Sequence, residues 1–106
     1  MAKFLVKASY TGEGTKGLLK EGGSSRKATV EKMIKGVGGS VESFYFAFGE
    51  TDVFVICDLP DSTTAAALSL AINASGTVNM SIIPLLTVQE IDQAAKKSVS
   101  YRAPGA

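Results

Sequence analysis

The sequence of 106 residues contains no histidine and a single cysteine, Cys57. Because histidine is the commonest general base and the usual proximal ligand of haem iron, a Ser-His or Cys-His nucleophile and a His-ligated haem are excluded. Zinc sites built from cysteine and histidine are excluded for the same reason. Acidic residues form no cluster typical of a calcium or magnesium site. We therefore expect no metal and no cofactor, and any enzyme made from this chain would use tyrosine, lysine, a carboxylate or Cys57.

Long hydrophobic runs are also missing. The apolar run near the N-terminus spans residues 4–6, which is too short for the core of a signal peptide. The longest uncharged stretch, residues 62–89, is interrupted by polar residues, glycine and proline and does not predict a membrane span. A lone cysteine cannot form an intramolecular disulfide and is typical of a reducing compartment. We expect a cytoplasmic protein without membrane contact.

Charge is nearly balanced but unevenly distributed, with 11 basic and 10 acidic residues and a net charge of +1. Residues 1–35 contain eight basic and three acidic side chains, whereas residues 36–95 contain seven acidic side chains and no basic one. A nucleic-acid-binding domain would carry a larger excess of basic residues, so we expect no nucleic acid partner. The asymmetry reflects either chance placement on a folded surface or complementary patches that meet between subunits.

The length indicates one domain, which we place at residues 1–97, followed by a flexible tail at residues 98–106. Hydrophobic periodicity and capping residues predict four strands and four helices. The expected strands are residues 3–10, 41–48, 53–58 and 77–83, and the expected helices are residues 15–22, 24–37, 61–74 and 87–97. The caps are assigned to Ser24 or Ser25, to Asp61 or Ser62, and to Thr87, with a loop at residues 11–15. The main order, β-α-β-β-α-β, predicts an α+β domain of the ferredoxin-like type with an antiparallel sheet and an extra short C-terminal helix.

Both faces of the predicted hairpin are apolar. Within residues 41–48, Tyr45 and its neighbours on one face oppose Phe44, Phe46 and Phe48 on the other. This strand is expected at a sheet edge, yet it has no proline or lysine to prevent pairing with another chain. A second copy is the simplest cover for such a surface, which predicts a homodimer or a larger homo-oligomer. The alternative is a monomer with an irregular apolar surface.

The hairpin and the helix after it resemble the GYD domain family of small bacterial proteins. The resemblance is carried by the segment GGSVESFYFAFGETDV at residues 38–53, by Leu59-Pro60-Asp61 and by the alanine-rich helix that follows. It extends from residue 3 to about residue 94. The resemblance implies a ferredoxin-like fold of the dimeric α/β-barrel kind and implies no established activity.

Two residues match the Gly-Tyr-Asp signature of that family, Gly49 and Asp52, whereas Thr51 stands at the tyrosine position. If the family tyrosine carries chemistry, this chain lacks it. We interpret the matching residues as structural, with Gly49 at a positive φ and Asp52 accepting a backbone N–H.

A second glycine pattern, Gly12-x-Gly14-x-x-Gly17, has the spacing of a dinucleotide fingerprint between a strand and a helix. The next strand leads into a tight hairpin and the chain is too short for a doubly wound sheet, so this interpretation fails. A looser hypothesis is an anion at the start of the helix, near Lys16 and Lys20.

The ligand-binding residues that we predict follow from the dimeric barrel that the resemblance implies, in which the open face of the sheet lines a cavity. We expect Lys7, Ser9, Tyr45 and Asn79 to face it. A lysine in an apolar cavity has a lowered pKa and acts as a base or forms an imine, and Tyr45 would donate a hydrogen bond to a carbonyl. The structural alternative places the Lys7 ammonium at the rim and packs Tyr45 into the interface. We interpret Cys57 as a core residue.

Three classes of function remain open. The first is a homo-oligomeric module that binds a small molecule or anion. The second is a cofactor-free enzyme, such as an isomerase or a monooxygenase-like protein that uses tyrosine and lysine. The third is a structural protein that assembles with itself. A polar-lined cavity favours the first two, and a filled, dry interface favours the third. Arg26, at a helix start, is assigned to the solvated surface in preference to an anion clamp.

Overall fold

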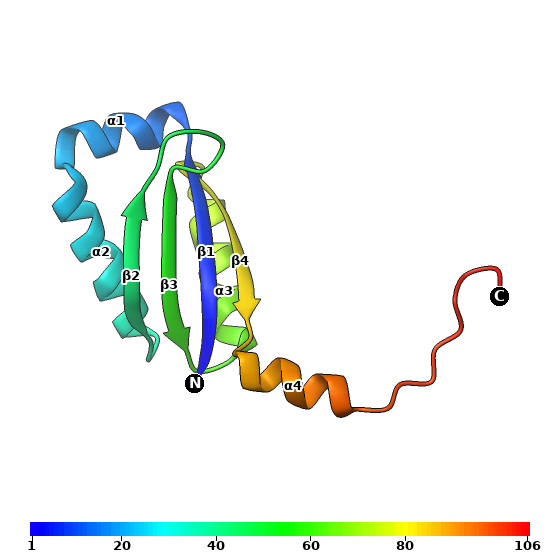
Figure 1. Cartoon of the computed structure of the whole chain (residues 1–106). Coiled ribbons are helices and arrows are strands. Elements are labelled where there is room, and N and C mark those ends of the chain that lie inside the picture. Colours follow the sequence, from blue (N-terminus) through cyan, green and yellow to red (C-terminus); the bar gives the residue numbers. More distant parts are fainter.

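Four strands form one antiparallel sheet in the order β2-β3-β1-β4 (Figure 1). The computed structural model describes residues 1–106, and its strands are β1 (Ala2–Tyr10), β2 (Ser40–Phe46), β3 (Val53–Leu59) and β4 (Val78–Leu85). Its helices are α1 (Gly12–Glu21), α2 (Gly23–Gly36), α3 (Ser62–Ala74) and α4 (Val88–Lys96). This order is the ferredoxin-like plan with two helices in the first crossover and one added at the C-terminal end. The predicted α+β fold is confirmed.

One face of the sheet is covered by helices and the other is open. Helix α3 lies behind the sheet and α2 lies beside β2 (Figure 1). Ile34 of α2 and Leu68 of α3 are buried in the same core, to which the strands contribute Phe4, Val6, Val53, Val55, Cys57, Leu59, Val78 and Met80. Successive side chains of a strand point to opposite faces, so the residues between these core positions lie on the open face.

The interpretation of Cys57 as a core residue is confirmed, because its side chain is fully buried. Burial disfavours the charged thiolate and raises the pKa of the Cys57 thiol. The thiol is therefore a packing group rather than a nucleophile.

The first crossover differs from the prediction at both helix starts. Helix α1 begins at Gly12, not after a loop, because the Thr11 hydroxyl accepts the Gly14 N–H and caps the helix. The predicted caps Ser24 and Ser25 are wrong as well. Gly22, at φ 85°, ends α1 through its N–H to the Leu18 carbonyl and directly precedes α2, which leaves no extended residue for a side-chain cap.

The hairpin between β2 and β3 is fastened to the end of β1. Gly49 has a φ of 142°, a conformation that glycine alone adopts readily. The Asp52 carboxylate accepts the Tyr10 N–H at 2.9 Å, and the Asp52 N–H donates to the Ala8 carbonyl at 2.8 Å. The structural interpretation of both signature residues is confirmed.

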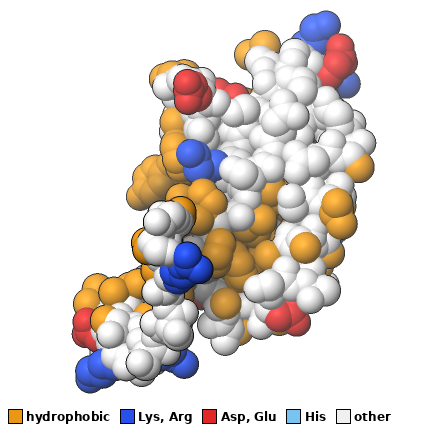
Figure 2. Space-filling view, turned by 90° about the vertical axis from the view of Figure 1, so that its right-hand side faces the viewer, with side chains coloured by type: hydrophobic (Ala, Val, Ile, Leu, Met, Phe, Trp, Pro, Cys, Tyr) orange, Lys and Arg blue, Asp and Glu red, His pale blue; other side chains and the backbone are white.

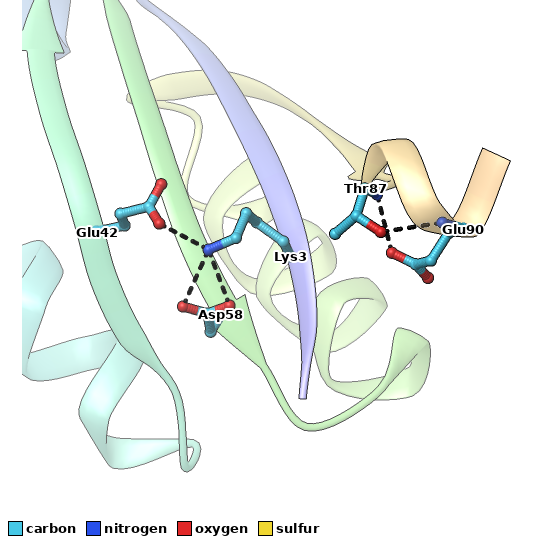
Figure 3. Close-up of polar contacts among 5 residues, drawn as sticks. All are labelled: Lys3, Glu42, Asp58, Thr87 and Glu90. Carbon is cyan, nitrogen blue, oxygen red and sulfur yellow. Dashed lines mark hydrogen bonds and ion pairs between the residues drawn. The ribbon is translucent and has the colours of Figure 1, made fainter. Parts of the chain in front are cut away.

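The later helices begin where their caps predict. Asp61 accepts the Thr64 N–H at 2.8 Å at the start of α3. Thr87 and Glu90 form the predicted capping box of α4, with hydrogen bonds of 2.9 and 3.1 Å (Figure 3). Helix α4 has no buried residue and projects from the sheet together with residues 97–106 (Figure 1). None of the helices has the length and hydropathy needed to cross a lipid bilayer.

The outer edge of β4 is occupied by a side chain of α3. The Asn73 amide nitrogen donates to the Met80 carbonyl at 3.0 Å, and its amide oxygen accepts the Met80 N–H at 2.8 Å. These are the two backbone groups of Met80 that point away from β1, so the amide takes the place of a neighbouring strand at this position.

Candidate functional site

The open face of the sheet is a regular grid of side chains. Strand β1 places Leu5, Lys7 and Ser9 on it. Leu5 stands between Ile56 of β3 and Ile83 of β4 in the strand register. Because directly opposed side chains are about 5 Å apart, each row across the sheet is a line of contacting neighbours.

An apolar band crosses this face and has no cover in the single chain. It consists of Leu5, Tyr45, Phe54, Ile56 and Ile83. Tyr45 is 70% exposed and Ile83 is 40% exposed. Figure 2, which looks onto the β4 side, shows hydrophobic side chains gathered over the middle of the molecule next to the projecting arm. Val88 and Ile91 of α4 are also exposed.

An ion-pair network closes one end of the apolar band. The Lys3 ammonium lies 2.8 Å from Glu42 of β2 and 3.2 Å from Asp58 of β3 (Figure 3). The hydrogen bond to Glu42, and then that to Asp58, raises the pKa of Lys3. One ammonium is shared by two carboxylates, so this end of the face keeps a net charge of −1 and offers no free cation to a ligand.

A polar hollow of about 370 Å³ lies at the opposite end of the same face. Its lining consists of Lys7, Ser9, Glu50, Thr51, Asn73, Asn79, Met80 and Ser81. Asn79 stands opposite Ser9, and Ser81 opposite Lys7, in the pairing of β1 with β4. Three of the four predicted ligand-binding residues are thus brought together. Thr51, which occupies the signature tyrosine position, joins them and was not among the predicted site residues.

The hollow contains one cation without a partner. The Lys7 ammonium makes no hydrogen bond or ion pair within the chain, whereas the Ser9 hydroxyl donates to the Glu50 carbonyl. Lysine offers three donors and no acceptor, so the hollow suits a ligand with oxygen acceptors.

Tyr45 does not reach the hollow. It lies on the open face as predicted, but Phe54 stands between it and Lys7 in the strand register. Two inter-strand spacings separate Tyr45 from Lys7, about 10 Å. Tyr45 therefore belongs to the apolar band, next to Phe54, and does not line the hollow.

The glycine pattern near the N-terminus forms no phosphate-binding loop. Gly12, Gly14 and Gly17 all lie within α1, so no open loop joins β1 to the helix. Lys16, suggested for an anion, lies 3.7 Å from Glu13 on the helix surface. No group of three or more cysteine or acidic side chains is placed to hold a metal ion.

Arg26 is only partly on the solvated surface to which it was assigned. The residue is half-buried and lies at the edge of an apolar cavity between the helices and the sheet, with its Nε buried. Its position depends on the packing of α1, α2 and the sheet, which no local pattern around residue 26 records.

A sequence model of the GYD domain matches residues 4–95. The chain belongs to the GYD domain family. The match includes β1 from Phe4 onward, the other three strands and every residue that lines the hollow, so the apolar band and the polar hollow are parts of the GYD domain itself. No curated protein and no solved structure is significantly similar to the chain.

Proposed function

We propose that this GYD domain protein is a homo-oligomer that binds a small polar molecule or anion at the end of its subunit interface. The observation that carries the proposal is the composition of the open sheet face, where an apolar band adjoins a hollow with an unpaired lysine. The apolar part is suited to a second copy and the hollow to a ligand.

The second copy is argued from the apolar band. A contiguous apolar patch on a sheet face is typical of an interaction surface, and a two-fold axis covers such a patch with the same patch of another chain. The Lys3 network, which carries a net charge of −1, lies at one end of the band and would lie at the rim of such a contact. This arrangement is the dimeric barrel that the family resemblance implies.

The ligand is argued from the donors of the hollow. Lys7 supplies a charge, and Asn79, Ser81 and Thr51 supply amide and hydroxyl groups that donate and accept. Because Glu50 lines the hollow as well, the ligand that suits this set carries both an anionic group for Lys7 and hydroxyl groups that donate, as a hydroxy acid does. The hollow is shallow in the single chain, and a second copy across the apolar band would enclose it.

The oligomer is tested by light scattering after size-exclusion chromatography and by native mass spectrometry of freshly purified protein. We expect a dimer or a larger species for the native chain. Leu5→Lys places a charge in the middle of the band and should give a monomer. The matched control is Leu70→Lys, because Leu70 is an equally large side chain that is 74% exposed on α3. A native chain that is monomeric at micromolar concentration would overturn the proposal.

The ligand is tested in the same spectra. An extra small-molecule mass on the native chain that is lost in Lys7→Ala, but kept in Lys35→Ala on α2, supports the hollow as the site. An oligomer that carries no added mass and binds no member of a small-anion panel in thermal-shift assays would favour self-assembly as the function instead.

A further inference from the structure

An apolar groove of about 420 Å³ lies where the end of β2 meets the turn between α1 and α2. Five of its eight lining residues are hydrophobic, namely Tyr10, Leu18, Phe46, Ala47 and Phe48. We call it the aromatic groove. Its two polar side chains already have partners, since the Thr15 hydroxyl donates to the Thr11 carbonyl and the Asp52 carboxylate accepts the Tyr10 N–H. The groove therefore presents mainly aromatic and aliphatic surface.

One wall of the aromatic groove is held in place and the other is free. The Phe46 ring packs on Gly23, where a Cβ would lie 3.1 Å from it, and edge-on against Phe44 with the ring centroids 5.2 Å apart. Phe48, in contrast, is fully exposed. Aromatic side chains are enriched in the core of protein interfaces, so an exposed ring beside an apolar groove indicates a contact surface.

Helix α4 is a second apolar feature that nothing covers. Val88, Ile91 and Ala95 follow one another at intervals of three and four residues, so they form an apolar stripe along one side of the helix. All nine residues of α4 are exposed. Isolated helices shorter than about 12–15 residues are marginal in water, so a helix of this length takes most of its stability from packing of its apolar side.

The α4 stripe cannot reach the aromatic groove of its own chain. Helix α4 follows the end of β4 that pairs with Lys3, whereas Tyr10, at the other end of β1, lines the groove. The length of β1 separates them, about 26 Å for a strand of nine residues, and α4 is about 14 Å long. Figure 1 shows α4 leaving the sheet at the end opposite to the hairpin.

We propose that α4 of one copy packs its apolar stripe into the aromatic groove of a second copy, and that the contact is reciprocal. The inference rests on the self-association proposed above and adds a second contact to it. A two-fold axis that runs across the strands, between two facing sheets, places the Lys3 end of one sheet over the hairpin end of the other. Three inter-strand spacings, about 14 Å, separate β4 from β2, which is the length of α4.

The exchanged helices supply surface that the apolar band lacks. Stable interfaces comprise about 20–30 residues on each side, whereas the band has five apolar residues. The hairpin that lines the aromatic groove through Phe48 also lines the polar hollow through Glu50 and Thr51. The α4 helix of the second copy therefore lies at the mouth of the hollow and helps to enclose it.

The test is the dissociation constant of the oligomer of the full-length chain, measured by sedimentation velocity at several concentrations. Ile91→Gln on the stripe and Phe48→Ser in the groove should each weaken association about tenfold or more. If the two side chains meet, the double variant should associate no more weakly than the weaker single variant. The matched controls are Gln93→Ser, on the polar side of α4, and Leu70→Ser, on the exposed side of α3, and both should leave the constant unchanged.

A mixed sample tests whether the contact joins two copies. A nitroxide is attached to an unlabelled Gln93→Cys chain, which is then mixed with the isotope-labelled native chain; Cys57 is fully buried and is not modified. We expect the nitroxide to broaden the amide signals of Phe46 and Phe48 in the native chain. A monomeric native chain would overturn this proposal together with the proposed function. An oligomer with no broadening there, with additive losses in the double variant, or with a constant unchanged by Ile91→Gln and Phe48→Ser would overturn this proposal alone.

Discussion

At Gly14 one missing methyl group sets how closely α1 approaches the sheet. A Cβ at this position would overlap the Thr77 carbonyl oxygen and lie 3.1 Å from the Tyr10 ring. Because the overlap is with backbone, a side-chain rotation cannot relieve it. We expect Gly14→Ala to destabilise the protein by about 1–3 kcal/mol, the usual range for an overpacked site. The measurement is the free energy of unfolding in urea at a fixed protein concentration.

The control is Gly17→Ala in the same helix. No atom lies within 4 Å of a Cβ built at Gly17. Alanine is favoured over glycine in a helix by about 1 kcal/mol, so this variant should be as stable as the native chain or more stable. If both variants change stability alike, helix propensity rather than contact with Thr77 decides at residue 14.

The roles of residues that interact with near neighbours in the sequence were predicted, and the roles of residues placed by tertiary packing were not. Asp61 and Thr87 were identified as caps because the donor lies three residues along the chain. The position of Arg26 was not identified, because the cavity beside it is built by residues from both crossovers and all four strands.

At the scale of the element, the N-terminal cap of α3 makes a pH-dependent contribution to the free energy of unfolding. The Thr64 N–H and hydroxyl both donate to the Asp61 carboxylate and lower the pKa of Asp61. The unfolded chain therefore takes up this proton at a higher pH than the folded chain. The stabilisation is complete above the ordinary pKa of an aspartate and is lost as the pH falls through the lowered value.

We expect Asp61→Asn, which keeps a capping oxygen but no charge, to be less stable than the native chain at neutral pH. The difference should shrink as the pH falls below the ordinary aspartate pKa. Urea unfolding of both chains at neutral and acid pH measures it. The control is Asp92→Asn on α4, since the Asp92 carboxylate accepts no hydrogen bond. A difference that stays constant with pH would refute the assignment.

Helix α4 contributes nothing to the core. A chain that ends at Leu86 should keep the sheet and the other three helices. In a Leu5→Lys background, in which the proposed association is disrupted, we expect the urea midpoint to be unchanged by this truncation. Circular dichroism should lose only the signal of α4. A lower midpoint would mean that α4 packs on the domain in solution.

The bounds of the strands and of the later helices were predicted to within a few residues, because hydrophobic periodicity and helix-capping residues are local signals in the sequence. The start of α1 was missed because glycines at positions 12, 14 and 17 favour a loop in isolation, whereas Thr11 and the contact with Thr77 hold them in a helix. Alternation along β1 correctly placed Lys7 and Ser9 on the open face. Register decided that Tyr45 lies apart from them, and register is a tertiary property.

For the whole molecule, the apolar band and the uneven charge distribution predict opposite effects of salt on the strength of self-association. An interface made by complementary charges weakens as salt screens them, whereas an apolar interface does not. Because the proposed contact is made by the apolar band and the Lys3 ammonium pairs with carboxylates of its own chain, we expect the dissociation constant of the oligomer to change little between low and high salt. Sedimentation velocity at several concentrations measures it. Strong weakening by salt would favour complementary patches between subunits.

The Asn73 amide on the edge of β4 limits how copies of the chain can be added. A sheet grows into a fibre when a strand of one molecule pairs with the free edge of the next. At β4 this would require Met80 to exchange its two hydrogen bonds with Asn73 for bonds to another chain. Growth by strand addition is therefore opposed at this edge. A contact between the open faces of two copies would bury both faces and leave neither free to bind a third copy. The β4 edge therefore disfavours open-ended strand addition, which leaves β2 as the edge at which a strand of another chain could pair.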